Sequence, residues 1–276
     1  KKAMKAPYQS SPSESNQLEM LKKLELSFES QIRLKEYCNN KGITFMSTAF
    51  DKQSLDFLLA DLDVPILKIP SGELNNHPLL FEFAKAKKKM ILSTGMSTIE
   101  EIEECLGVIA YGLLDEKKPG REAFLNAFES SDGKNILKKY VTLLHCSSQY
   151  PTPLDDSNIN VMISLKEYFG LKVGFSDHTQ DNLTAFTAAA LGASVIEKHI
   201  TLDKHMSGPD HLSSSDINEF KEYVASIRKV KRILGDKEKV LLKGEIANRE
   251  VSRKSIVASE PIEKNEIFTE DNITTK

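Results

Sequence analysis

One repeated unit dominates the sequence: a short apolar segment that ends in small or polar residues and leads into a segment of helical character. The apolar segments lie at residues 43–50, 66–69, 90–92, 141–144, 173–175 and 194–196. Short apolar runs without strict alternation are typical of strands that are covered on both faces. Because strands that alternate with helices form parallel sheets, the repeat predicts an α/β fold with six strands in this chain.

Polar residues gather just after these strands, for example Ser71-Gly-Glu73 after the second and Ser93-Thr-Gly95 after the third. TIM barrels and open doubly wound sheets both place their sites at this carboxyl edge. The sequence has no G-x-G-x-x-G after a strand and no G-x-x-x-x-G-K-[ST]. Dinucleotide-binding and P-loop folds therefore lose their main support.

The remaining segments frame this repeat. Residues 1–16 have the composition of a loop, residues 17–40 have helical periodicity for one or two helices, and residues 216–234 form an amphipathic helix pattern. The polar stretch 114–135 is interpreted as an insertion of unknown purpose. We expect a barrel domain over residues 1–244, and a linker with the beginning of a small β-rich module over residues 245–276.

Charge and cysteine content exclude several classes of protein. The chain has 276 residues, with 37 Lys and Arg against 40 Asp and Glu, so its net charge of −3 offers no basic surface for nucleic acid. No apolar run approaches the ~20 residues of a membrane span. Three cysteines without metal-type spacing favour a reducing, cytoplasmic setting. The first residue is Lys1 and not Met, which indicates a processed or truncated chain.

Two histidines follow successive predicted strands. His178 and His199 lie 21 positions apart, about one strand-helix repeat, so adjacent barrel strands would direct both imidazoles into one mouth. Neutral imidazoles at such a place bind a divalent metal. The alternative, that the two are unrelated polar histidines, stays open on spacing alone.

Several other residues at strand ends have binding chemistry. Lys68 lies within an apolar strand, so it needs a polar cavity or an anionic partner, for which Glu73 is a candidate, unless it reaches solvent at the strand end. Hydroxyl and glycine turns, here at Ser71 and Ser93, hold phosphate well but are also ordinary turns. Asp210 follows the last strand, in a segment that is equally a simple turn, and Cys146 is assigned to packing.

Together these motifs resemble the bacterial sialic acid synthase family. The resemblance rests on segments in matching order across nearly the whole chain: Lys68-Ile-Pro-Ser-Gly-Glu73, Ile91-Leu-Ser-Thr-Gly-Met96, Leu144-His-Cys146 with Tyr150-Pro-Thr-Pro153, Phe175-Ser-Asp-His-Thr179, Glu197-Lys-His199 and Gly208-Pro-Asp210. The resemblance implies condensation of phosphoenolpyruvate with N-acetylmannosamine, or a related hexose, to a nine-carbon sialic acid and phosphate. It also implies a TIM (β/α)8 barrel, followed by an antifreeze-like domain, in a homodimer.

The resemblance also implies roles for individual residues. His178 and His199 match ligands of a catalytic Mn²⁺ or Mg²⁺, which would polarise the aldehyde of the open-chain sugar. The phosphoenolpyruvate-binding positions are Lys68, Ser71, Ser93 and Gly95, and the residues that line the site are Glu73, Tyr150, Ser176 and Asp210. Lys68, Glu73 and Asp210 are accordingly the catalytic candidates.

The sequence departs from the family pattern in three places. Ser148 stands where some members carry an asparagine that holds substrate, which leaves the choice among N-acetylneuraminic, legionaminic and pseudaminic acid open. Nothing corresponds to the active-site residues of the family's first two strands. The tail ends before the arginine expected to reach the partner subunit's site. The alternatives are therefore another phosphoenolpyruvate-using or aldolase-type barrel, and a catalytically incomplete fragment that only binds ligand.

Overall fold

The computed structural model describes residues 17–276 except residues 116 and 209. The loop expected over residues 1–16, and Pro209 of the Gly208-Pro-Asp210 motif, lie outside the described residues. The chain divides into two compact units, Lys1–Leu234 and Gly235–Lys276. The boundary expected after residue 244 falls inside the second unit, while the domain identities remain predictions.

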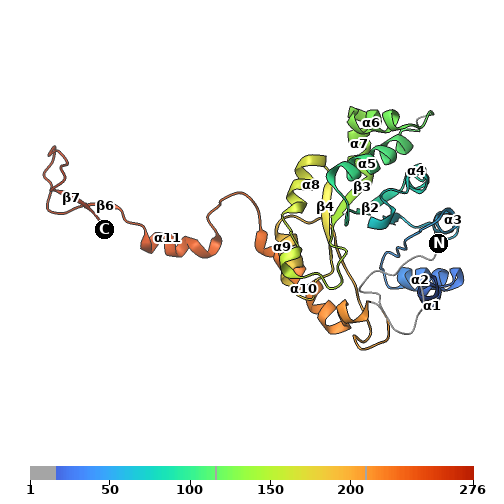
Figure 1. Cartoon of the computed structure of the whole chain (residues 1–276). Coiled ribbons are helices and arrows are strands. Elements are labelled where there is room, and N and C mark those ends of the chain that lie inside the picture. The colour runs from blue at the N-terminus through green and yellow to red at the C-terminus, as the bar shows by residue number, and fades with distance from the viewer. Residues whose placement is uncertain (1–16, 116, 209) are drawn as a thin grey trace. The chain divides into compact units, whose positions relative to one another are not determined.

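Five strands form the sheet of the first unit (Figure 1). Their order follows the sequence, β1-β2-β3-β4-β5, and all neighbouring pairs are parallel. The strands are β1 (Ile66–Ile69), β2 (Lys89–Ser93), β3 (Val141–His145), β4 (Lys172–Asp177) and β5 (Ile196–Lys198). Sequential order in a parallel sheet is the arrangement of a barrel wall, so the predicted α/β class is confirmed and this unit holds about half of a barrel.

The first of the six predicted strands is wrong. Residues 43–50 make only an isolated parallel bridge, between Thr48 and Lys68 of β1. The next helix, α3 (Lys52–Ala60), begins directly behind this bridge, with the Asp51 carboxylate accepting a hydrogen bond from the Ser54 backbone N–H. The segment thus pairs with β1 at one residue only, and the chain then turns into α3.

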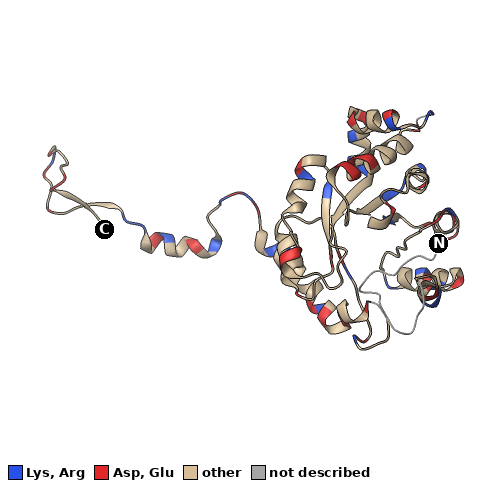
Figure 2. Cartoon of the chain, in the orientation of Figure 1, with Lys and Arg blue, Asp and Glu red and all other residues tan. Residues whose placement is uncertain are grey.

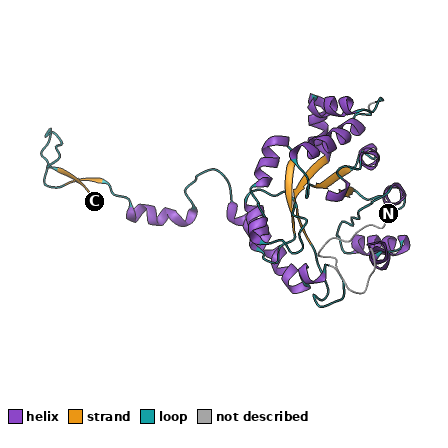
Figure 3. Ribbon diagram, in the orientation of Figure 1, coloured by secondary structure: helices purple, strands orange, loops and turns teal. Residues whose placement is uncertain are grey.

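Helices connect the strands and lie around the sheet (Figure 3). Two helices, α1 (Gln17–Leu24) and α2 (Phe28–Asn40), occupy the expected N-terminal span. The others of this unit are α4 (His77–Lys85), α5 (Ile99–Leu113), α6 (Arg121–Glu129), α7 (Ser131–Tyr140), α8 (Val161–Phe169), α9 (Leu183–Ala190) and α10 (Ile217–Leu234). The polar stretch interpreted as an insertion is therefore mainly helical, and α7 leads directly into β3.

The core lies between the sheet and its helices. Buried strand residues such as Leu67, Leu92 and Leu143 pack with helix residues such as Phe83 and Leu106 in one apolar cluster. Burial of apolar surface is the main stabilising contribution to a fold of this kind. The cluster anchors the strands, so the polar residues at their carboxyl ends project from a fixed frame.

The second unit is small and has little buried surface. It contains the short 3₁₀ helix η5 (Lys243–Glu245), the helix α11 (Ile246–Ser252) and an antiparallel pair of strands, β6 (Ile256–Ala258) and β7 (Ile273–Thr275). The buried Asn272 carboxamide holds the loop between β6 and β7. Its Oδ1 accepts a hydrogen bond from the Thr269 N–H at 2.8 Å, and its Nδ2 donates to the Ile267 carbonyl at 3.0 Å. The tail was expected to be β-rich; it has two short strands, and the helix α11 was not predicted.

Charged residues of both signs lie along the helices, while the strands are mostly uncharged (Figure 2). This distribution agrees with the small net charge of −3. Among the described residues, no helix combines the length and apolar character needed to cross a membrane.

Candidate active site

The side chains singled out in the sequence meet at the carboxyl ends of the strands. Residues two positions apart on a strand share a face of the sheet. Ser176 and His178 therefore leave β4 on the same face, as Glu197 and His199 leave β5. Lys68 of β1 reaches this face as well, because its Nζ lies 3.8 Å from the Glu197 carboxylate.

Lys68 and Ser93 form the first half of the site. The Lys68 Nζ donates a 2.7 Å hydrogen bond to the Ser93 Oγ, and only 11% of the Lys68 side chain is exposed. Burial lowers the pKa of Lys68, and the nearby Glu197 carboxylate acts in the opposite direction. A desolvated ammonium beside a hydroxyl is a suitable group for a phosphate or carboxylate ligand.

The expected pairing of Lys68 with Glu73 is wrong. Glu73 lies in the 3₁₀ helix η2 (Ser71–Glu73), and its Oε2 accepts a 2.7 Å hydrogen bond from the Asn76 Nδ2. Glu73 lies in the turn that leads from Pro70 to α4. Glu197, in contrast, reaches Lys68 from β5, at the other edge of the sheet. A sequence distance of five residues therefore misled the prediction.

The segments that follow β1, β2 and β3 meet at a tight turn around Gly95. The Gly95 N–H donates to the Ser71 Oγ at 2.9 Å, and the Cys146 Sγ lies 3.4 Å from the same hydroxyl. A Cβ on Gly95 would lie 2.9 Å from the Ser148 Oγ and 3.0 Å from both Cys146 Sγ and Ser71 Oγ. Gly95 thus permits the close approach of Ser71, Cys146 and Ser148, so Cys146, for which the sequence predicts a packing role, instead lies at the site.

Two imidazoles and a phenol form the second half of the site. The His178 and His199 ring centroids are 5.3 Å apart, so the structure brings the two predicted metal ligands together. The Tyr150 ring lies 4.1 Å from the ring of His178 and 5.5 Å from that of His199. The three rings thus contact one another.

The hydrogen bonds of His178 fix which of its nitrogens is protonated. Its Nδ1 lies 2.5 Å from the Ser147 carbonyl, which only accepts, so Nδ1 carries the proton and donates it. Ser176 donates its single hydroxyl proton to the Glu197 Oε1 at 2.5 Å, so it donates none to the His178 Nε2, which lies 3.3 Å from the same oxygen. Burial lowers the pKa of His178, against the effect of the Ser147 contact, and so favours the neutral ring.

These donors fit a divalent metal ion. Metal-bound imidazoles are neutral and usually donate their second N–H to a carbonyl or carboxylate, as His178 does here. Over residues 17–115, 117–208 and 210–276, no cluster of three His, Cys, Asp or Glu side chains could hold a metal. His178 and His199 would therefore supply two ligands, and water or substrate oxygens the others.

Glu197 is the site residue that the sequence reasoning missed. It contacts Ser176 on β4 and Lys68 on β1, so it links the two halves of the site. Its position two residues before His199 placed it on the same face of β5, and a carboxylate in a short strand was the available signal.

Asp210 lies apart from these contacts. It precedes the short 3₁₀ helix η4 (His211–Ser213), and its backbone carbonyl accepts hydrogen bonds from the hydroxyls of Ser213 and Ser214. The described contacts bring neither Asp210 nor Glu73 to the cluster, and their catalytic roles remain predictions.

The chain is similar to known proteins along nearly its whole length. N,N'-Diacetyllegionaminic acid synthase from Campylobacter jejuni is 44% identical over 278 residues, which cover 100% of this chain and 76% of the relative. Human N-acetylneuraminate-9-phosphate synthase is 33% identical, with coverage of 100% and 70%. The crystal structure of an N-acetylneuraminic acid synthetase from Leptospira borgpetersenii matches with a TM-score of 0.70 at 28% identity, covering 85% of this chain and 73% of that one.

The family assignment rests on a match over most of the chain. The NeuB family matches residues 1–239, which include all five strands of the parallel sheet and both imidazoles. This chain belongs to the NeuB family.

Proposed function

We propose that this protein condenses phosphoenolpyruvate with an open-chain N-acylated hexose, giving a nine-carbon 2-keto sugar acid and inorganic phosphate. One observation carries the proposal: Glu197 joins the Lys68 half of the site to the half formed by His178 and His199. An anion-binding ammonium and a metal-type imidazole pair thus share a single cluster. This is the chemistry that a phosphorylated donor and an aldehyde acceptor require.

The Lys68 half would bind phosphoenolpyruvate. The buried Lys68 ammonium would pair with an anionic group of this substrate, and the Ser93 hydroxyl beside it would donate a hydrogen bond. Ser71 and Gly95 would close the turn against the ligand, since Gly95 already approaches Ser71 closely.

The histidine half would hold Mn²⁺ or Mg²⁺ through His178 and His199. When bound, the metal supplies Lewis acidity that polarises the acceptor's aldehyde. His178 is kept neutral by its burial and is oriented by the Ser147 carbonyl. The Tyr150 ring contacts both imidazoles and would shield the acceptor from bulk water.

The proposed reaction forms one C–C bond and releases phosphate. The methylene carbon of phosphoenolpyruvate attacks the aldehyde carbon, and the aldehyde oxygen takes up a proton as a hydroxyl. Water adds to the cationic carbon that carries the phosphate, and C–O cleavage then yields the ketone and inorganic phosphate. Glu73 and Asp210 are proposed as proton-transfer groups in these steps, together with Lys68.

The nature of the acceptor is a separate proposal. The sequence motifs favour N-acetylmannosamine as the acceptor, with N-acetylneuraminate as the product. The higher identity to a synthase of N,N'-diacetyllegionaminic acid, 44% against 33% for the human enzyme, favours an acceptor with two N-acetyl groups. N-Acetylneuraminate and pseudaminate are the alternative products, and Ser148, next to Gly95, is a candidate determinant of this choice.

The larger assembly is also proposed from the family. We propose that the five-stranded sheet is part of a TIM barrel and that residues 245–276 begin an antifreeze-like domain. A homodimer in the cytoplasm would be the working state of the enzyme.

Product formation tests this function. The purified 276-residue protein is incubated with Mn²⁺, phosphoenolpyruvate and, in separate reactions, mono- and di-N-acetylated hexoses. The proposal predicts phosphate release together with a 2-keto sugar acid of the expected mass. Binding of phosphoenolpyruvate without turnover would identify a binding-only fragment, and a product of different mass would indicate another aldolase-type reaction.

A further inference from the structure

A buried ion pair lies behind the two imidazoles, on the opposite face of the same strands. The Asp177 Oδ2 is 3.1 Å from the Lys198 Nζ, and the two side chains are 0% and 3% exposed. Asp177 immediately precedes His178, and Lys198 immediately precedes His199. Because burying two charges gives little net stability, a pair of this kind needs a further explanation.

Both oxygens of the Asp177 carboxylate accept hydrogen bonds. Its Oδ1 accepts from the Thr179 N–H at 2.9 Å and the Thr179 Oγ1 at 2.7 Å, and its Oδ2 accepts from the Tyr223 hydroxyl at 2.9 Å. Burial, and then the charge of Asp177, raise the pKa of Tyr223, so this hydroxyl remains a donor. Asp177 therefore joins β4 to α10 through Tyr223.

The ion pair also holds both backbone groups of Thr179. Asp177 accepts from the Thr179 N–H, and the Lys198 Nζ donates to the Thr179 carbonyl oxygen. An aspartate that accepts from the N–H two residues ahead forms a turn around the residue between them. That residue is His178, so its backbone conformation is fixed from both sides.

The strand pairing ends where the histidines begin. Asp177 and Lys198 are the last paired residues of β4 and β5. Beyond them, the His178 carbonyl accepts from the Thr152 N–H at 2.9 Å, and the His199 carbonyl accepts from the Ser215 N–H at 3.0 Å. Each histidine is thus held on its outer side by a different loop, and the ion pair is the nearest link between their two strands on this face.

We infer that Asp177 and Lys198 are positioning residues that set the orientation of the His178 ring relative to His199. They touch no reacting group and act through the turn at Thr179. The inference rests on the proposed function, in which these imidazoles hold a metal ion.

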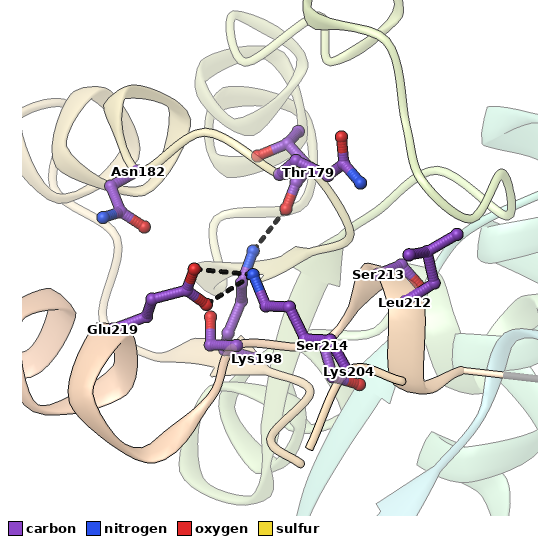
Figure 4. A pocket seen from close by; sticks show the side chains of 10 residues that line it. Thr179, Asn182, Lys198, Lys204, Leu212, Ser213, Ser214 and Glu219 are labelled. Atoms are coloured by element: carbon purple, nitrogen blue, oxygen red, sulfur yellow. Dashed lines mark hydrogen bonds and ion pairs between the residues drawn. The ribbon is translucent and has the colours of Figure 1, made fainter. Parts of the chain in front are cut away.

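A second ion pair nearby provides a matched control. The Lys204 Nζ lies 2.6 Å from the Glu219 carboxylate, and the two side chains are 33% and 44% exposed. Both residues line the same cavity of about 60 Å³ as Lys198 and Thr179 (Figure 4). Lys204 lies on the loop after β5 and Glu219 on α10. This pair also joins a lysine to a carboxylate, but neither residue belongs to a strand.

The test compares the double variant Asp177→Leu/Lys198→Met with the control Lys204→Met/Glu219→Leu in the 276-residue protein. A buried ion pair replaced by apolar side chains often keeps its stability. We expect the first variant to fold, but with a lower urea unfolding midpoint, because the Tyr223 hydroxyl and the Thr179 N–H lose their acceptor, and to bind Mn²⁺ about tenfold or more weakly, by electron paramagnetic resonance. We expect the control to bind Mn²⁺ as the wild type does.

The ¹⁵N signals of the imidazoles in metal-free protein give the deciding readout. We expect the His178 signals, assigned with His178→Ala, to shift in the first variant and to stay unchanged in the control. Unchanged His178 signals in the folded variant would overturn the inference. If the double variant does not fold, Lys198→Met alone, which removes the hydrogen bond to the Thr179 carbonyl, gives the same readout. A wild type that binds no Mn²⁺ would refute the metal part of the proposed function, while the imidazole signals still decide this inference.

Discussion

The two halves of the candidate site respond differently to the same physical condition. Burial lowers the pKa of both Lys68 at the end of β1 and His178 after β4. Lys68 has a carboxylate partner, Glu197, which favours the charged ammonium, whereas His178 donates to a backbone carbonyl through Nδ1 and leaves Nε2 as a lone-pair donor. Burial therefore keeps the His178 ring neutral, which suits a metal, whereas the carboxylate partner of Lys68 favours the charged ammonium, which suits an anion.

Removing an imidazole should have the largest effect. We expect His178→Ala or His199→Ala to lower the rate of product formation by on the order of 10³-fold, because the site loses its stabilisation of developing charge. Circular dichroism should show the fold unchanged. His205→Ala, which removes an exposed histidine from the loop after β5, is the control. Equal activity of all three variants would remove both imidazoles from the site.

Removing the ammonium should affect the other half selectively. We expect Lys68→Met to weaken phosphoenolpyruvate binding by about 10- to 100-fold, since one charge-assisted hydrogen bond is lost. Mn²⁺ affinity should change little, because the imidazoles are untouched. Calorimetric titrations with each ligand measure the two affinities separately. Lys89→Met, at the exposed start of β2, is the control, and a parallel loss of both ligands would contradict the division into halves.

A methyl group in the tight turn should have an intermediate effect. Gly95→Ala would place a Cβ within 3.0 Å of three side-chain atoms, so we expect a loss of about 1–3 kcal/mol in the free energy of unfolding and weaker phosphoenolpyruvate binding. Gly72→Ala, in the 3₁₀ helix η2 after β1, would place a Cβ with no atom within 4 Å, so its free energy of unfolding should differ little from that of the wild type. Urea titrations of the two variants compare them directly, and equal stabilities would show that the turn is not crowded.

A helix cap outside both halves should have the smallest effect. Asp51→Ala should lower the free energy of unfolding by about 0.5–2 kcal/mol and leave both ligand affinities unchanged. Hydrogen bonds from the Ser54 backbone and side chain hold the pKa of Asp51 below its ordinary value. The stabilisation is therefore complete above about pH 4 and is lost as the pH falls further. Urea titrations of both proteins across this range should converge at acidic pH, and a constant difference would contradict this.

The sequence predicted the elements whose signal is local. The apolar segments of β1 to β5 and the long helix α10 appear close to their expected positions, because their burial pattern is written in consecutive residues. The segment over residues 43–50 has the same composition but makes one bridge, at Thr48. Whether such a segment forms a strand also depends on its pairing with neighbouring strands, which its composition does not reveal.

The site was predictable where residues follow a strand and not where the partner comes from another strand. His178 and His199 were found because each stands at a strand end. The partner of Lys68 was misassigned to Glu73, since Glu197 lies 129 positions away in the sequence and meets Lys68 only through the curvature of the sheet. The pair behind the histidines was missed because Asp177 and Lys198 look like ordinary polar residues of a strand end.

The central claim is that the two halves form one site, and ³¹P relaxation of phosphoenolpyruvate in the presence of protein-bound Mn²⁺ tests it most directly. Because the paramagnetic effect falls steeply with distance, the ³¹P signal should broaden strongly in the wild-type protein. The broadening should disappear in His178→Ala, which loses the metal, and in Lys68→Met, which loses the ligand. Phosphoenolpyruvate that binds the wild type together with Mn²⁺ yet keeps a narrow ³¹P signal would contradict the claim.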